Sequence, residues 1–85
     1  MPVYMDTHDS TNLPDALRQK VASRVRSGEK DAFGVVDRGI VIDKVAGKMH
    51  CVLDAPNTEA IMKHHQSLDV PLVRETIHEA DIILR

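Results

Sequence analysis

The chain has few of the residues that stabilise a small protein from within. Its 85 residues include one cysteine, Cys51, one tyrosine, one phenylalanine and no tryptophan. A single cysteine excludes an intrachain disulfide. A chain of this length buries only roughly 60–65% of its unfolded surface, so its own core is small. We therefore expect further stabilisation from a metal ion, from a partner chain, or from both.

A concentrated basic surface is also missing. The sequence has 11 lysines and arginines against 13 acidic residues, which gives a formal net charge of -2. The basic residues are spread along the chain, and Tyr4 and Phe33 are the only aromatics besides histidine. Nucleic-acid binding normally depends on a clustered basic face with stacking aromatics. We therefore expect no nucleic-acid partner.

Long apolar runs do not occur. No segment approaches the roughly 20 apolar residues that a helix needs to cross a bilayer. The first ten residues already carry a charge at Asp6 and lack the apolar core of a signal peptide. We expect no membrane association and a cytoplasmic location, where a free thiol stays reduced.

The alternation of apolar residues predicts four strands in a single domain, residues 1–85. We expect these strands at residues 2–8, 35–43, 48–54 and 74–84. The short segment between the second and third strands predicts a hairpin. Gly39, inside the second strand, suggests a bulge or a close backbone approach.

Two helices separate these strands. The first is expected to follow the 9–12 turn and to carry an apolar stripe that runs from Leu13 to Phe33. Gly34 is then the residue that ends it. The second helix is expected to begin at Asn57 or Thr58 and to end before Pro71.

The order strand, helix, strand, strand, helix, strand fits the ferredoxin-like βαββαβ fold. This α+β fold is a four-stranded antiparallel sheet with two helices on one face, and we expect the dimeric α/β-barrel type. The other sheet face would be left bare, although its strands are rich in valine, methionine and isoleucine. A second copy packed sheet to sheet would cover it, so we predict a homodimer through the open sheet face.

Two motifs point to a known family. The chain opens with M-P-V-Y-M-D-T-H-D, and C-V-L-D-A-P-N-T-E-A begins at Cys51. The patterns MPxYMDxHD and CxxxAPxxEA resemble a family of small bacterial ferredoxin-like proteins, long filed as a domain of unknown function, whose characterised relatives bind nickel. The resemblance runs from Met1 to about Ile77 and implies a ferredoxin-like fold, a homodimer and a nickel site. His65 lies at the position of the family's histidine in the second helix.

Some positions depart from the family pattern. Ser23 and Asp69 stand where the family carries histidine, and Arg26 stands where it carries aspartate. Residues 40–42 are aliphatic where the family's second strand is aromatic.

Five candidate metal ligands fall into two groups. Tyr4, Asp6 and His8 share one face of the first strand, because alternate strand residues point the same way. His65 and Asp69 are four residues apart, so they lie on one helix face if the helix extends as far as Asp69. Imidazole and carboxylate groups suit nickel, and they suit zinc or copper equally well.

The alternation also predicts which way these side chains point. Val3 and Met5 are expected to face the helices, which puts His8 on the open sheet face. A shared site would then need His65 to reach around the sheet edge, or the two histidines would belong to two separate half-sites. We expect His64 to be a solvated neighbour and Cys51 to be a small buried apolar residue.

These observations favour a homodimeric metal-binding protein with a role in metal sequestration or sensing. The motifs H-E-x-x-H, C-x-x-C, G-x-S-x-G and the P-loop are all absent. One alternative is a cofactor-free monooxygenase or isomerase of the dimeric α/β-barrel class, in which a histidine serves as general base. Another is a dimerisation or ligand-sensing module that has lost its metal site.

Overall fold

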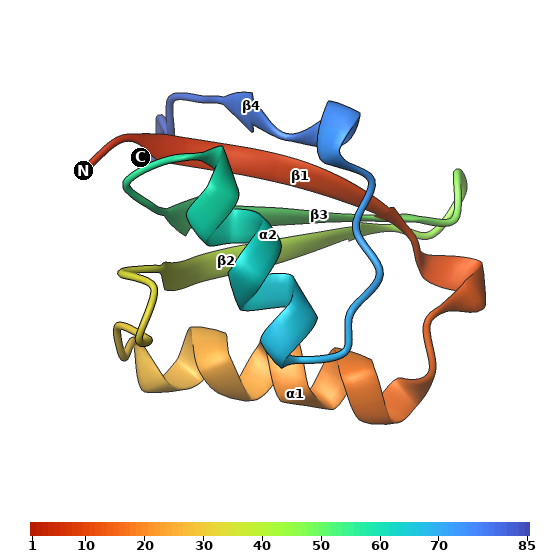
Figure 1. The fold of residues 1–85 in the computed structure, drawn as a ribbon. Helices are drawn as coiled ribbons and strands as arrows, with labels where there is room; N and C mark the ends of the chain where they lie inside the picture. Colours follow the sequence, from red (N-terminus) through yellow and green to blue (C-terminus); the bar gives the residue numbers. More distant parts are fainter.

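The computed structural model describes residues 1–85, with the exception of the side chain of Asn12. The strands β1 (Val3–Asp9), β2 (Val36–Asp43), β3 (Lys48–Asp54) and β4 (His78–Glu79) form one antiparallel sheet in the order β2-β3-β1-β4. Helices α1 (Asp15–Ser27) and α2 (Thr58–Ser67) form the second layer (Figure 1). This arrangement confirms the predicted ferredoxin-like α+β fold. None of the described helices is long and apolar enough to cross a membrane.

Strand β1 faces the helices with the side that carries its polar residues. Asp6 and His8 are buried, with exposed fractions of 0% and 5%, whereas Val3 and Met5 are only partly buried. The prediction that Val3 and Met5 face the helices is therefore wrong. The polar side chains can be buried because they contact one another and residues of α2, as described below.

Helix α1 ends earlier than predicted. It stops at Ser27, where Gly28 adopts the left-handed conformation (φ 64°) and its N–H bonds the carbonyl of Arg24. Gly34 instead lies in a turn organised by Asp31, whose carboxylate accepts the backbone N–H of Val35. Phe33 is therefore outside the helix and 37% exposed.

The hairpin and the start of α2 agree with the sequence. Strands β2 and β3 are joined by a turn over residues 44–47, and the register of the pair shifts between Asp37 and Gly39, as expected of a bulge. The side chain of Asn57 accepts the N–H of Ala60 and caps α2.

The last strand is much shorter than the predicted 74–84. Residues Arg74–Thr76 form a 3-10 helix (η2), so they cannot join the sheet as a strand. The N–H of Thr7 bonds the hydroxyl of Thr76 instead of a strand carbonyl. Only His78–Glu79 pairs with β1, although Ala80 also donates its N–H to Val3.

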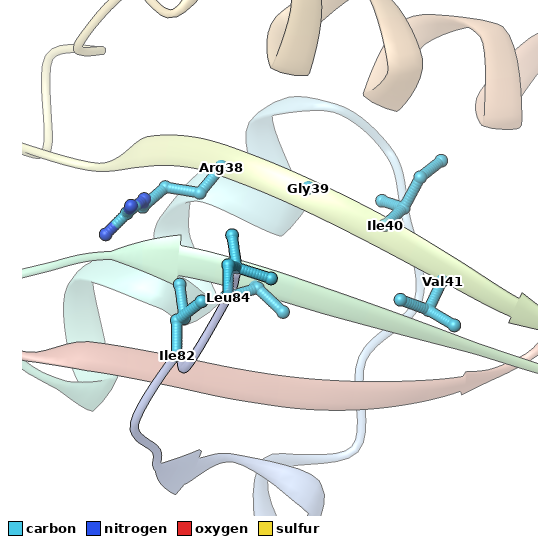
Figure 2. A pocket seen from close by; sticks show the side chains of 7 residues that line it. Arg38, Gly39, Ile40, Val41, Ile82 and Leu84 are labelled. Carbon is cyan, nitrogen blue, oxygen red and sulfur yellow. The ribbon is translucent and has the colours of Figure 1, made fainter.

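The end of the chain then passes over the open face of the sheet (Figure 2). Ile82 and Leu84 help to line a shallow groove of about 200 Å³ with residues of β2 and with Val52 of β3. Much of this surface is apolar and exposed: Leu84 is 82% and Val41 is 60% exposed. The opposite face is covered by the helices, and the core lies between these two layers. Its fully buried members include Val35, Met49, Leu53, Ala55 and Ile61.

Candidate metal centre

A cluster of ligand-type side chains lies in the layer between the sheet and α2. Asp6 and His8 come from β1, Cys51 from β3 and His65 from α2. All four are buried, and their ligand atoms lie within 4.8 Å of one another. The β1–β3 register pairs Asp6 with Cys51, which places the carboxylate and the thiol side by side.

Asp6 is the centre of this cluster. Its Oδ1 lies 2.6 Å from Nε2 of His8, and its Oδ2 lies 3.4 Å from Nε2 of His65. The two imidazole rings are stacked, with centroids 5.1 Å apart. His8 and His65 therefore converge on one carboxylate, and the predicted separation of these residues by the sheet is wrong.

The other nitrogen of each ring is held by a backbone carbonyl. Nδ1 of His8 donates to the carbonyl of Pro71 at 2.8 Å, and Nδ1 of His65 donates to that of Ile61 at 2.8 Å. A proton on Nδ1 leaves Nε2 as the basic nitrogen of a neutral imidazole. Metal-binding histidines are usually oriented by such an outer hydrogen bond.

Several polar atoms of the cluster have no hydrogen-bond partner among the described residues. They are both carboxylate oxygens of Asp6 and Nε2 of His8. The contact between them is short, but its geometry is not that of a hydrogen bond. Buried polar groups are normally satisfied, so orphaned atoms that face each other require an explanation. A cation between them would satisfy all three.

Cys51 completes the cluster and is 1% exposed, with no disulfide. Burial raises the pKa of its thiol far above the ordinary value, and the charges of Asp6 and Asp37 raise it further. The thiol therefore stays protonated at neutral pH unless a cation compensates the thiolate charge. Its predicted burial is confirmed.

The two histidines differ in basicity. Burial lowers the pKa of His8, but contact with Asp6 and the negative charge of Asp6 outweigh this effect, so the net pKa lies above 6.5. Burial also lowers the pKa of His65, and the charge of Asp6 compensates only in part, so its net pKa lies below 6.5. Of the two histidines, His8 is therefore the one at which a proton competes more strongly with a metal ion.

The remaining predicted ligands lie outside this group. Tyr4 is on the same face of β1, two residues from Asp6, and packs against the hydrophobic core. Asp69 is exposed and has a positive φ of 58° just beyond the end of α2. The four grouped residues are therefore Asp6, His8 and His65, which the sequence suggested as ligands, and Cys51, which it suggested only as a core residue.

His64 was predicted to be solvated, and this is wrong: it is 1% exposed. The buried residues of α2 are Ala60, Ile61, His64 and His65, which form two adjacent pairs one helical turn apart. That i, i+4 repeat is visible in the sequence and indicates that both histidines face the sheet.

A cavity of about 280 Å³ opens beside His8. Leu13 and Leu72 line it, together with the backbone partner of His8, Pro71. Of the four grouped residues, only His8 lines this cavity.

Comparison with known proteins supports the fold only. No family model matches the sequence, and no curated protein matches it. A solved structure is similar: the protein SCO4226 from Streptomyces coelicolor A3(2), with a TM-score of 0.68 and 20% sequence identity. The match covers 96% of this chain and 99% of the other.

Proposed function

We propose that this protein binds a transition metal ion through Asp6, His8, Cys51 and His65. The observation that carries the proposal is the set of orphaned atoms on Asp6 and His8, buried against each other while both histidines present Nε2 to the same carboxylate. Two imidazoles, a thiolate and a carboxylate can form a four-coordinate site. Only small movements are needed, since the ligand atoms are already within 4.8 Å of one another.

The donor set favours a borderline transition metal over calcium or magnesium, which prefer oxygen ligands. Nickel is the metal suggested by the resemblance of the MPxYMDxHD and CxxxAPxxEA motifs, and zinc or copper suits the same ligands. We propose that the site serves metal sequestration or sensing, because a buried four-ligand site leaves no coordination position for a substrate.

The cavity beside His8 is the feature that favours an enzyme of the cofactor-free type. A general base needs a nitrogen that can reach the substrate. However, Nδ1 of His8 is bonded to Pro71 and Nε2 contacts Asp6. We therefore assign the cavity to ion access and keep catalysis as the second candidate.

We also propose that the protein is a homodimer through its open sheet face. The apolar exposure of Val41, Ile83 and Leu84 on and beside that face supports a partner surface. A second copy is the expected partner, because small domains with one bare sheet face commonly pair.

Metal titration of the untagged, chelator-treated protein tests the metal proposal. Calorimetry with Ni²⁺ and with Zn²⁺ at pH 7.5 should give tight binding in the parent and a large loss in His8→Ala and His65→Ala. His78→Ala is the matched control, since His78 is exposed on β4. Equal binding by all four proteins would exclude the buried cluster, and no binding by the parent would favour a module without a metal.

A further inference from the structure

A third buried histidine repeats the arrangement of the first two. His64 donates Nδ1–H to Oδ2 of Asp31 at 2.6 Å, and its Nε2 lies 2.8 Å from Oδ2 of Asp37. Despite that distance, neither Nε2 of His64 nor Oδ2 of Asp37 has a hydrogen-bond partner among the described residues. The carboxylate of Asp31 thus holds Nδ1 of His64 from outside, and Nε2 of His64 faces the buried carboxylate of Asp37, whose Oδ2 has no hydrogen-bond partner among the described residues.

This second pair adjoins the first. His64 and His65 are consecutive in α2, and their rings meet edge to face with centroids 5.5 Å apart. Asp37 is 4% exposed and lies on β2, where it pairs with Leu53, two residues from Cys51 on β3. The negative charges of Asp6 and Asp37 both act on the Cys51 thiol. The two Asp–His pairs therefore flank Cys51 beneath one helix.

The charges of this layer are unbalanced. Asp6 and Asp37 are buried carboxylates, and Asp31 is largely covered. Among the described ion pairs, Arg24 brings the only arginine or lysine charge to the layer, with its Nε 4.0 Å from Asp37. Buried carboxylates require compensating positive charge. The single Arg24 does not balance these carboxylates, and protonated histidines or bound cations can supply the rest.

We propose that His64 and Asp37 form a second cation-binding position next to the first, which makes the centre a two-ion site. The second ion is a divalent transition metal coordinated by Nε2 of His64 and the carboxylate of Asp37. Asp31 orients His64 from outside, as carboxylates do for metal-binding histidines. On binding, any proton on Nε2 of His64 leaves to solvent. This inference rests on the proposed metal-binding function.

Two protein ligands predict weaker binding than four. The titration should therefore show one tight equivalent of Zn²⁺, followed by a second, weaker one. The alternative is an ion pair in which a protonated His64 is held between Asp31 and Asp37 and never exchanges its proton for a metal.

Stoichiometry separates these cases. We would titrate Zn²⁺ alone into the chelator-treated parent, into His64→Asn and Asp37→Asn, and into His78→Asn as the control. Loss of the weaker equivalent in the first two variants, with the tight equivalent and the control unchanged, is the expected result. A single equivalent in the parent overturns the second position but keeps the proposed function, whereas no binding overturns both.

A second measurement uses only the parent protein, because a substitution at His64 or Asp37 could prevent folding. Proton NMR of the histidine ring signals can follow the parent during the titration. The first equivalent should shift the rings of His8 and His65, and the second should shift the ring of His64 in proportion to the added metal. A His64 signal that stays unchanged during the second equivalent contradicts the proposal.

Discussion

Asp6 contacts both His8 and His65, with its two carboxylate oxygens each directed at the Nε2 atom of a different ring. This relationship joins β1 to α2 through a carboxylate that is 0% exposed. A single side chain thus determines whether the two imidazoles act as one site.

Replacing Asp6 should therefore disable the site. In Asp6→Asn the amide keeps the shape of the side chain but loses its charge and one acceptor oxygen. We expect metal affinity to fall by more than roughly 100-fold, beyond the range seen for outer-sphere changes. Calorimetry with Zn²⁺ measures the affinity of the parent and of Asp6→Asn. Asp81→Asn, at an exposed position, is the matched control and should bind like the parent.

Metal affinity should depend on pH through two protons. Metal binding displaces a proton from the Cys51 thiol, whose raised pKa keeps it protonated, so affinity should fall about tenfold per pH unit from pH 8 downward. As the pH falls through the raised pKa of His8, which lies above 6.5, a second proton competes and the dependence should steepen.

Calorimetry between pH 8 and pH 6 provides this test. Cys51→Ser should bind more weakly and should lose most of the slope at the alkaline end. An affinity that does not change with pH would argue that neither group is a ligand.

Cys51 should be slow to react in the folded protein. The thiol is 1% exposed and its raised pKa leaves little thiolate. We expect slow labelling by a thiol reagent in buffer, slower labelling still with bound metal, and rapid labelling in denaturant. Rapid labelling of the native protein would show that the side chain of Cys51 is not on the side of β3 that the helices cover.

Truncation of Ile61 should destabilise the layer that carries the cluster. Ile61 is 0% exposed in α2, next to the sheet. Ile61→Ala should lower the free energy of unfolding by about 2–5 kcal/mol. Val45→Ala in the hairpin turn is the control, since Val45 is 100% exposed and a surface change is expected to stay within about 0.5 kcal/mol. Denaturant unfolding of both variants measures the difference.

The homodimer prediction can be tested by sedimentation equilibrium. At micromolar concentration the parent should show about twice the 9.5 kDa chain mass. Val41→Asp places a charge on the open face and should shift the protein to monomer, whereas Val45→Asp in the hairpin turn should not. A parent that is monomeric at all concentrations would mean that Ile82 and Leu84 of its own chain cover enough of the face.

The order of elements could be predicted from the sequence because each element has its own apolar period. The ends of the elements were harder to predict where two sequence signals compete. Gly28 and Gly34 are both able to end a helix, and the sequence does not reveal that Asp31 builds a turn between them. In the last segment, the alternation continues through residues that form a 3-10 helix, so it overstates the length of β4.

The site was only partly predictable for a different reason. The prediction for β1 assumed that its apolar side, with Val3 and Met5, faces the helices, which puts Asp6 and His8 on the other side. That assumption considers each polar residue without its partners. The burial of Asp6 and His8 becomes favourable only when residues from α2 and β3 face them, and that pairing is a property of the fold. The importance of Cys51 likewise depends on its partner across the β1–β3 ladder.

X-ray absorption at the metal edge tests the central claim most directly. In protein loaded with one equivalent of Zn²⁺, we predict one sulfur ligand at about 2.3 Å with two imidazoles and an oxygen at about 2.0–2.2 Å. The sulfur contribution should disappear in Cys51→Ser. A spectrum of the parent with nitrogen and oxygen ligands alone would contradict the account, because the ion would then be bound away from Cys51.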